Sequence, residues 1–228
     1  MHLKSRLVGI VILYCSITVS GQVYESINKE AADLFISLSN KDAGYREEIE
    51  ELKSVLLVDA KNQELELNYF TSIVSYDSLK DHFKSFEKEL ENIPLDSALV
   101  LFNQWYLHFS NTFYNYAEDK FFSSNKTKIL FFSTSMSCYC TLEMSKNQTV
   151  DIIKFIKENN DEYDYWVVDS FEHNELQIEY MTLFAPSVIV FDSDNEVLYK
   201  IEYEEKMLEQ LIAFINGKHA NKNKTGKS

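Results

Sequence analysis

The chain is poor in the residues that interrupt regular structure, since its 228 residues include only two prolines and five glycines. This scarcity argues against long flexible linkers and against an all-β sandwich, whose many turns depend on these residues. Apolar residues make up 45% of the chain, and 16 phenylalanines and 14 tyrosines supply large side chains for a core. The sequence therefore predicts a well-packed protein of one large domain or two small ones.

Cationic residues are also scarce, and several common motifs are absent. Lysine and arginine total 22 against 36 aspartates and glutamates, which gives a formal net charge of −14. Such an acidic protein is expected to avoid nucleic acid and anionic membrane surfaces. The sequence contains no phosphate-binding glycine loop, zinc-protease motif or serine nucleophile elbow.

The first 21 residues have the three parts of a secretory signal peptide. Lys4 and Arg6 precede an apolar stretch at 7–14, and small residues follow as far as Gly21. Cleavage after residues 1–21 would remove both cations and change the net charge from −14 to −16. A secreted protein is predicted, and the alternative is a membrane-anchored protein that keeps this segment uncleaved.

Of three cysteines, Cys15 lies in the signal segment, and the mature chain keeps only Cys138 and Cys140. The pair follows an apolar strand-like run and opens an amphipathic helix. A structural disulfide normally closes a longer loop, so two thiols this close are expected to undergo redox cycling or bind metal. The helix N-terminus favours the thiolate form, which makes Cys138 the predicted nucleophile and Cys140 the more buried, resolving thiol.

Residues 22–122 have the periodicity of helices and predict an all-helical segment. Its apolar residues recur at helical spacing in four stripes, the last of which is long and aromatic and predicts core, with a ligand groove as the alternative. The stripes begin with Val23, Ile27, Ala31, Leu34 and Leu38, then Ile49, Leu52 and Leu56, then Leu79, Phe83, Phe86 and Leu90, and finally Leu95, Leu99, Phe102, Tyr106, Phe109, Phe113 and Tyr116.

The pattern changes at the polar residues 123–126, after which strands and helices alternate. Strands are predicted at 127–133, 165–169, 187–191 and 197–202, and helices at 141–159, 175–183 and 205–216. The first crossover should be parallel, and the turn at 193–196 should make the last two strands an antiparallel hairpin. Gly217 is predicted to end the last helix, and residues 218–228 to form a disordered polar tail.

This order of elements, with Ala185-Pro186-Ser187 opening the third strand, resembles the thioredoxin-like fold superfamily over about residues 127–216. The resemblance rests on the strand that leads into the cysteines, on Val167-Val168-Asp169, and on the run from Ala185 to Asp192. It implies an α/β domain at 123–217, of order β-α-β-α-β-β-α, preceded by the helical domain at 22–122. With the signal peptide, it resembles secreted, periplasmic thioredoxin-like proteins of bacterial envelopes.

The resemblance implies that Pro186 is a cis-proline lying against the cysteine motif. The motif itself departs from the family pattern Trp-Cys-x-x-Cys. Ser137 stands at the first cysteine's place and Met136 at the tryptophan's, while Cys138 is displaced one position inward. The family's buried aspartate, which handles a proton, falls on Phe131.

The first functional prediction is a thiol-disulfide oxidoreductase or isomerase that acts on client proteins through a redox-active Cys138-x-Cys140 pair. A ring smaller than that of Cys-x-x-Cys is more strained, which favours an oxidising or isomerising disulfide. The partners would be protein thiols or disulfides, together with a membrane redox protein. An extended client would bind beside Ala185 and Pro186, and Tyr139 would contact it from between the cysteines.

Two alternatives remain open from the sequence. The first is a Cu(I) chaperone, because Met136, Cys138, Cys140 and Met144 offer soft sulfur ligands and His173 follows the second strand. The second is a non-catalytic interaction module whose cysteines have no chemistry and whose helical segment binds a partner.

Overall fold

The structure is a computed structural model that describes residues 23–42, 44–59, 73–159 and 162–225. The chain divides into two compact units, residues 1–116 and 117–228. The predicted signal peptide and its cleavage site at Gly21 lie outside the described residues. Within the described ranges, no helix combines the length and the apolar character needed to cross a membrane.

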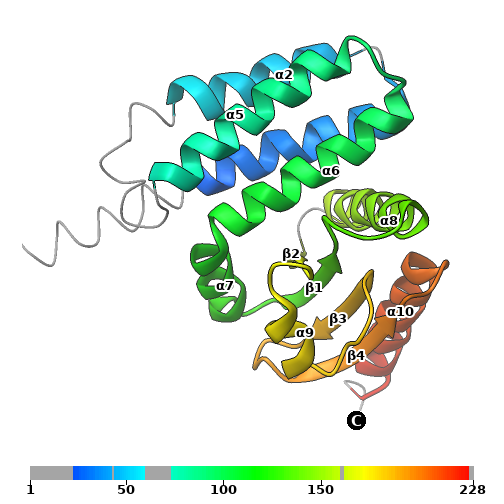
Figure 1. The fold of residues 1–228 in the computed structure, drawn as a ribbon. Coiled ribbons are helices and arrows are strands. Elements are labelled where there is room, and N and C mark those ends of the chain that lie inside the picture. Colours follow the sequence, from blue (N-terminus) through cyan, green and yellow to red (C-terminus); the bar gives the residue numbers. More distant parts are fainter. Residues whose placement is uncertain (1–22, 43, 60–72, 160–161, 226–228) are drawn as a thin grey trace, which may run out of the picture. The chain divides into compact units, whose positions relative to one another are not determined.

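Every regular element of the first unit that the structure describes is helical (Figure 1). Residues 23–40 form the first helix. They are followed by α2 (Tyr45–Ser54), which continues into a short π-helix (Val55–Asp59), by α5 (Ile73–Leu90) and by α6 (Leu95–Thr112). The first three predicted stripes are buried throughout.

Aromatic residues of α6 form the core of this unit. The aromatic stripe is therefore core, as predicted, rather than the lining of a ligand groove. The rings of Phe35 and Phe102 meet edge to face with centroids 5.0 Å apart. Trp105 donates its indole N–H to the carbonyl of Leu79 at 3.1 Å, so its polar atom is satisfied despite burial. The stripe extends over two helices, because α6 ends at Thr112 and α7 (Tyr114–Ser123) follows.

The second unit alternates strands and helices in the predicted order. It contains β1 (Thr127–Ser133), α8 (Tyr139–Glu158), β2 (Tyr163–Asp169), α9 (Asn174–Glu179), β3 (Ser187–Phe191), β4 (Val197–Glu202) and α10 (Met207–Thr225). The predicted bounds of β1, β3 and β4 are confirmed. These strands are short apolar runs with polar flanks, which is why the sequence locates them well.

The four strands form one sheet in the order β2-β1-β3-β4. As predicted, β1 and β2 are parallel and β3 and β4 form an antiparallel hairpin, while β1 and β3 are also antiparallel. The register pairs Ser133 with Asp169 and Phe132 with Ser187. The C-terminal ends of β1 and β2 therefore meet the N-terminal end of β3 at one edge, where the cysteines follow β1.

Helices cover this sheet, with α8 packed against β1 and β2, and α10 packed against β4 and α8 (Figure 1). Residues Ile129, Leu130, Phe131 and Phe132 of β1 are fully buried. Burial on both sides of a central strand explains why β1 reads as a continuous apolar run rather than as an alternating one. The thiol pair thus follows directly from a strand that is buried at the centre of the unit.

The end of the last helix differs from the prediction. Helix α10 continues past Gly217 to Thr225, so the predicted stop at Gly217 is wrong and the predicted tail at 218–228 is helical as far as Thr225. No described glycine has a positive φ. Gly217 therefore lacks the left-handed conformation through which glycine ends helices.

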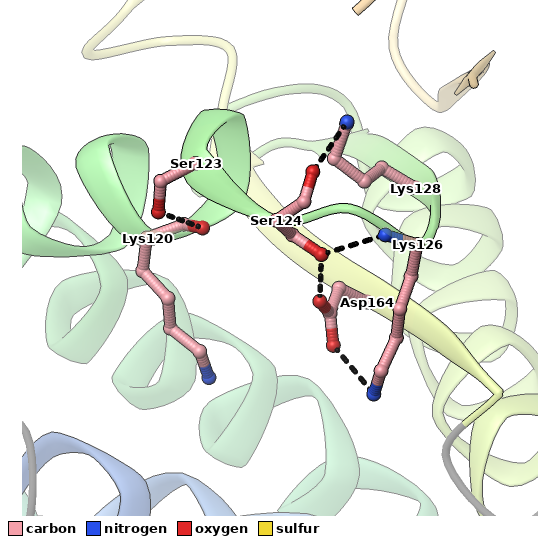
Figure 2. A network of polar contacts seen from close by, with 6 residues as sticks. All are labelled: Lys120, Ser123, Ser124, Lys126, Lys128 and Asp164. Carbon is pink, nitrogen blue, oxygen red and sulfur yellow. Dashed lines mark hydrogen bonds and ion pairs between the residues drawn. The ribbon is translucent and has the colours of Figure 1, made fainter. Parts of the chain in front are cut away.

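A polar network fastens the opposite end of the sheet from the cysteines. Figure 2 shows Ser124 between the start of β1 and Asp164 of β2, which accepts from the Ser124 hydroxyl and from Lys126 Nζ. Lys128 is fully buried and donates from Nζ to the carbonyl of Ser124 at 3.0 Å and to that of Ser193 at 3.4 Å. These contacts join the end of α7, β1, β2 and the β3–β4 turn.

Candidate functional site

The loop between β1 and α8 is held by a buried carboxylate. Asp169, at the end of β2, is 1% exposed and accepts hydrogen bonds from the backbone N–H groups of Ser135 at 3.0 Å and Phe171 at 3.1 Å. The Thr134 hydroxyl donates to the carbonyl of Met136 at 3.0 Å. Asp169 therefore holds two loops in place, the one that follows β1 and the one that follows β2.

Cys138 is the N-cap residue of α8, with extended backbone angles of φ −65° and ψ 155°. Its carbonyl accepts the first hydrogen bonds of the helix, from the N–H groups of Thr141 at 3.0 Å and Leu142 at 3.1 Å. The helix begins at Tyr139, so Cys138 directly precedes its first turn and Cys140 lies in it. The prediction that Cys140 is more buried is wrong, because both thiols are exposed. A residue at the second helical position still projects beyond the packed face.

The sulfur of Cys138 has polar neighbours, among which Cys140 and Thr141 have the largest effect. It lies 2.8 Å from the sulfur of Cys140 and 3.2 Å from the hydroxyl oxygen of Thr141, three residues along the helix. The contact with Cys140, followed by the hydroxyl and the backbone amide of Thr141, lowers the pKa of the Cys138 thiol to about 7. These donors stabilise the thiolate, so a large fraction of Cys138 is nucleophilic at neutral pH.

The Ala185–Pro186 peptide bond is cis, which confirms the cis state that the resemblance implied for Pro186. Pro186 is buried, and its carbonyl accepts the N–H of Tyr203 at 2.9 Å. The hydroxyl of Tyr203 lies 3.3 Å from that of Thr141. Tyr203 thus contacts the proline loop through its backbone and the thiol-bearing helix through its side chain.

An open pocket of about 600 Å³ lies beside the cysteines, and Ala185 is part of its wall. Its lining includes five large apolar side chains that are exposed to solvent, at 64% for Met136, 53% for Phe171, 74% for Leu183, 60% for Phe184 and 44% for Tyr203. We call these five residues the apolar rim. Isolated exposed apolar residues are ordinary, but a group of five around one pocket indicates a binding surface.

Sequence reasoning missed four members of the apolar rim, because only Met136 was singled out. Leu183 and Phe184 directly precede Ala185, and an apolar pair in a loop before a proline was the available signal. Phe171 and Tyr203 each follow the end of a strand, where nothing in the local sequence distinguishes a pocket wall from a buried residue.

Glu202 shapes the loop that carries Leu183 and Phe184. Its Oε1 accepts hydrogen bonds from the backbone N–H groups of both residues, at 2.7 Å from Phe184 N. Because one carboxylate satisfies two consecutive amides, the loop is fixed with its apolar side chains toward solvent. Glu202 is therefore a positioning residue for the apolar rim.

The predicted metal ligands are only partly brought together. Cys138 and Cys140 are adjacent, but His173 Nδ1 lies 3.4 Å from Glu175 Oε1, and Met144 is half-buried on α8. Among the described residues, the Cys, His and carboxylate ligand atoms that converge in a group of three are those of Glu30, Glu48 and Glu51 in the first unit. Copper binding by the cysteines stays a prediction, as does client contact by Tyr139, whose side chain is exposed.

No family model matches the chain, and no curated protein is detectably similar to it. Among solved structures, it is similar to the germline-specific thioredoxin Deadhead of Drosophila melanogaster, with 16% identity, 45% of this chain and 90% of that one covered, and a TM-score of 0.35.

It is also similar to mitochondrial thioredoxin 3 of Saccharomyces cerevisiae, with 17% identity over 41% of this chain and 83% of that one and a TM-score of 0.34. The thioredoxin of Fasciola hepatica matches with 13% identity over 46% of this chain and 91% of that one, and with a TM-score of 0.34. Scores this low carry no argument by themselves. The thioredoxin-like character of the second unit rests on its own strand order, pairing directions and cis-proline.

Proposed function

We propose that this protein is a thiol-disulfide oxidoreductase or isomerase that acts on extended segments of client proteins through Cys138 and Cys140. The observation that carries the proposal is the 2.8 Å separation of two exposed sulfurs at the start of α8, one of which has its pKa lowered to about 7. A thiol that serves only to pack the core would be buried among apolar side chains.

The reaction follows from the positions of the two sulfurs. The Cys138 thiolate attacks one sulfur of a client disulfide, which forms a mixed disulfide and releases the other client sulfur as a thiolate. The Cys140 thiolate then attacks the Cys138 sulfur, so that the Cys138–Cys140 bond forms and the second client thiolate leaves. The client gains two electrons and the cysteine pair loses two, and the same steps in reverse oxidise a client dithiol.

The client is proposed to lie across the pocket, beside Ala185 and the cis-proline. The apolar rim would bind its side chains, and the Ala185 peptide would pair with its backbone as an added strand. We propose that this chemistry takes place outside the cytoplasm, in the periplasm if the source is a bacterial envelope, as the predicted signal peptide at 1–21 implies. The same proposal includes a membrane redox partner. It also keeps the predicted domains at 22–122 and 123–217.

The decisive experiment measures whether the two cysteines bond to each other. The purified protein is equilibrated in glutathione buffers of increasing oxidising potential, free thiols are trapped by alkylation, and the products are mapped by mass spectrometry. The expected product is an intramolecular Cys138–Cys140 disulfide with a single midpoint potential. Variants with serine at either position should instead form glutathione adducts at the remaining cysteine.

Metal content is measured on the same reduced sample, with Cu(I) titrated against a competing chelator. A pair that never forms its own disulfide, but retains one Cu(I) per chain with better than micromolar affinity, would replace the redox proposal with the chaperone alternative. A pair that does neither would leave the non-catalytic interaction module as the function.

A further inference from the structure

The residues that line the pocket, and their immediate sequence neighbours, include carboxylates but no lysine or arginine. The residues that line the pocket, with their immediate sequence neighbours, include four acidic residues, which are Asp169, Glu172, Glu202 and Glu204. None of these lining or neighbouring residues is a lysine or an arginine. Two of the carboxylates are already occupied, since Asp169 and Glu202 accept backbone N–H groups.

Glu172 and Glu204 are both exposed, and each directly follows an aromatic member of the rim, Phe171 or Tyr203. The surrounding stretch of the sequence extends the pattern. From residue 158 to 199 the sequence has no lysine or arginine, and α9 carries the exposed residues Glu175 and Glu179.

Carboxylates of α7 and α9 also lie close to one another. Desolvation, followed by the nearby charges of Asp119 and Glu179, raises the pKa of Glu118, and only His173 acts in the opposite direction. The lysines that border this region are engaged elsewhere. Lys146 is buried and pairs with Glu143 at 2.7 Å, and Lys200 donates to the carbonyl of Tyr180. Lys206, two residues after Glu204, is exposed and pairs with Glu209 at 3.4 Å.

We infer that the substrates of this site are extended polypeptide segments that combine apolar side chains with lysine or arginine. The apolar rim would take up the apolar side chains, and the exposed carboxylates of Glu172 and Glu204 would attract the flanking cations. This inference rests on the proposed function, and it specifies the client class of the same site. Acidic client segments would be rejected, because the carboxylates around the pocket repel the negative charges of such a client.

The test uses the Cys140→Ser variant, in which the mixed disulfide at Cys138 cannot be resolved. Three synthetic peptides share one apolar core with a single cysteine, and they are flanked by lysine, glutamine or glutamate. Each cysteine is activated as a mixed disulfide with thionitrobenzoate. Attack by Cys138 forms the protein–peptide disulfide and releases the coloured thionitrobenzoate thiolate, whose appearance gives the rate.

The expected order of rates is lysine, then glutamine, then glutamate, with about ten-fold between the extremes at low ionic strength. High salt should compress this range, because exposed charges are screened. A lysine-flanked peptide whose core is replaced by serines should react more slowly than the apolar one. Equal rates for the three charge types would overturn the inference.

A matched pair of charge variants separates a local effect from the overall acidity of the protein. Glu172→Gln with Glu204→Gln removes two carboxylates beside the rim, whereas Asp194→Asn with Glu196→Gln removes two exposed carboxylates from the β3–β4 turn at the other end of β3. Only the first pair should reduce the lysine-to-glutamate ratio. An equal reduction by both pairs would show that net charge alone is responsible, and would also overturn the inference.

The neutral reagent dithiodipyridine separates failure of the inference from failure of the proposed function. If Cys138 reacts rapidly with this reagent but shows no preference among peptides, the client class is wrong and the thiol chemistry stands. If Cys138 is also unreactive toward the reagent, and the wild type forms no Cys138–Cys140 bond, the proposed function itself is wrong.

Discussion

The hydroxyl oxygen of Thr141 lies 3.2 Å from the sulfur of Cys138, at the N-cap of α8. The two residues occupy the N-cap and third helical positions, which exchange hydrogen bonds in many helix starts. Here the N-cap side chain is a thiol, so the contact bears on reactivity as well as on helix formation. Tyr203, 3.3 Å from the same hydroxyl, connects this contact to the proline loop.

Replacement of Thr141 by valine is expected to raise the pKa of Cys138, because the isosteric side chain cannot donate to the thiolate. Alkylation at neutral pH should slow by only about two-fold, since a more basic thiolate is also a better nucleophile. The midpoint of the pH–rate profile for iodoacetamide is therefore the clearer measurement. Thr141→Ser keeps the hydroxyl and should retain the wild-type midpoint. A profile for T141V that overlies the wild type would exclude the contact as a cause.

The contact with Cys140 is the largest cause of the lowered Cys138 pKa, so its removal should have a stronger effect than that of Thr141. In the wild type, alkylation of Cys138 should rise with pH through a midpoint at about 7. Cys140→Ala should move this midpoint toward the ordinary thiol value of 9.0. Peptide mapping assigns the modified cysteine in each case. An unchanged midpoint in C140A would show that the sulfurs do not interact in solution.

Asp169 is expected to stabilise the site through its hydrogen bonds rather than by transferring a proton. Asp169→Ala leaves the N–H groups of Ser135 and Phe171 without their acceptor, which should lower the free energy of unfolding by about 1–3 kcal/mol. Asp169→Asn retains an acceptor oxygen and should recover much of this loss. Urea unfolding of the three proteins measures the difference. If D169N and D169A were equally destabilised, the negative charge rather than the hydrogen bonds would be responsible.

The buried Lys128 should make stability depend on alkaline pH. Burial lowers its pKa below the ordinary value of 10.5, so the proton binds more tightly to the unfolded chain than to the folded one. The stability contributed by deprotonation is fully present above 10.5 and is lost as the pH falls through the folded-state pKa. Relative to Lys128→Met, the wild type should therefore gain stability as the pH rises through the folded-state pKa of Lys128 toward 10.5.

Urea unfolding of the wild type and of K128M from neutral to strongly alkaline pH measures this difference, and subtraction cancels the titration of the other groups. Lys126→Met serves as the control, because Lys126 is partly exposed and its Nζ pairs with Asp164 at 3.2 Å. Parallel stability curves for the wild type and K128M would show that Lys128 has an ordinary pKa in the folded protein.

The strands and the position of the thiol pair could be predicted because their signals are local. The run from Thr127 to Ser133 is apolar over the length of one strand and has polar flanks, and the cysteines follow it directly. A central strand that is buried on both faces has such a continuous apolar run whichever strands it pairs with. The helix boundaries were less accurate, as at Gly217, because helix ends depend on backbone conformation and packing beyond the local residues.

The sequence by itself determined a four-stranded α/β unit with two neighbouring thiols at a helix start. Only the tertiary structure decided which side chains surround them. Phe171, Leu183 and Tyr203 come from three different loops, and the pairing of β1 with β2 and β3, and of β3 with β4, brings those loops to one edge of the sheet. Pairing between distant segments, rather than any local pattern, therefore placed an apolar rim and its carboxylates beside Cys138.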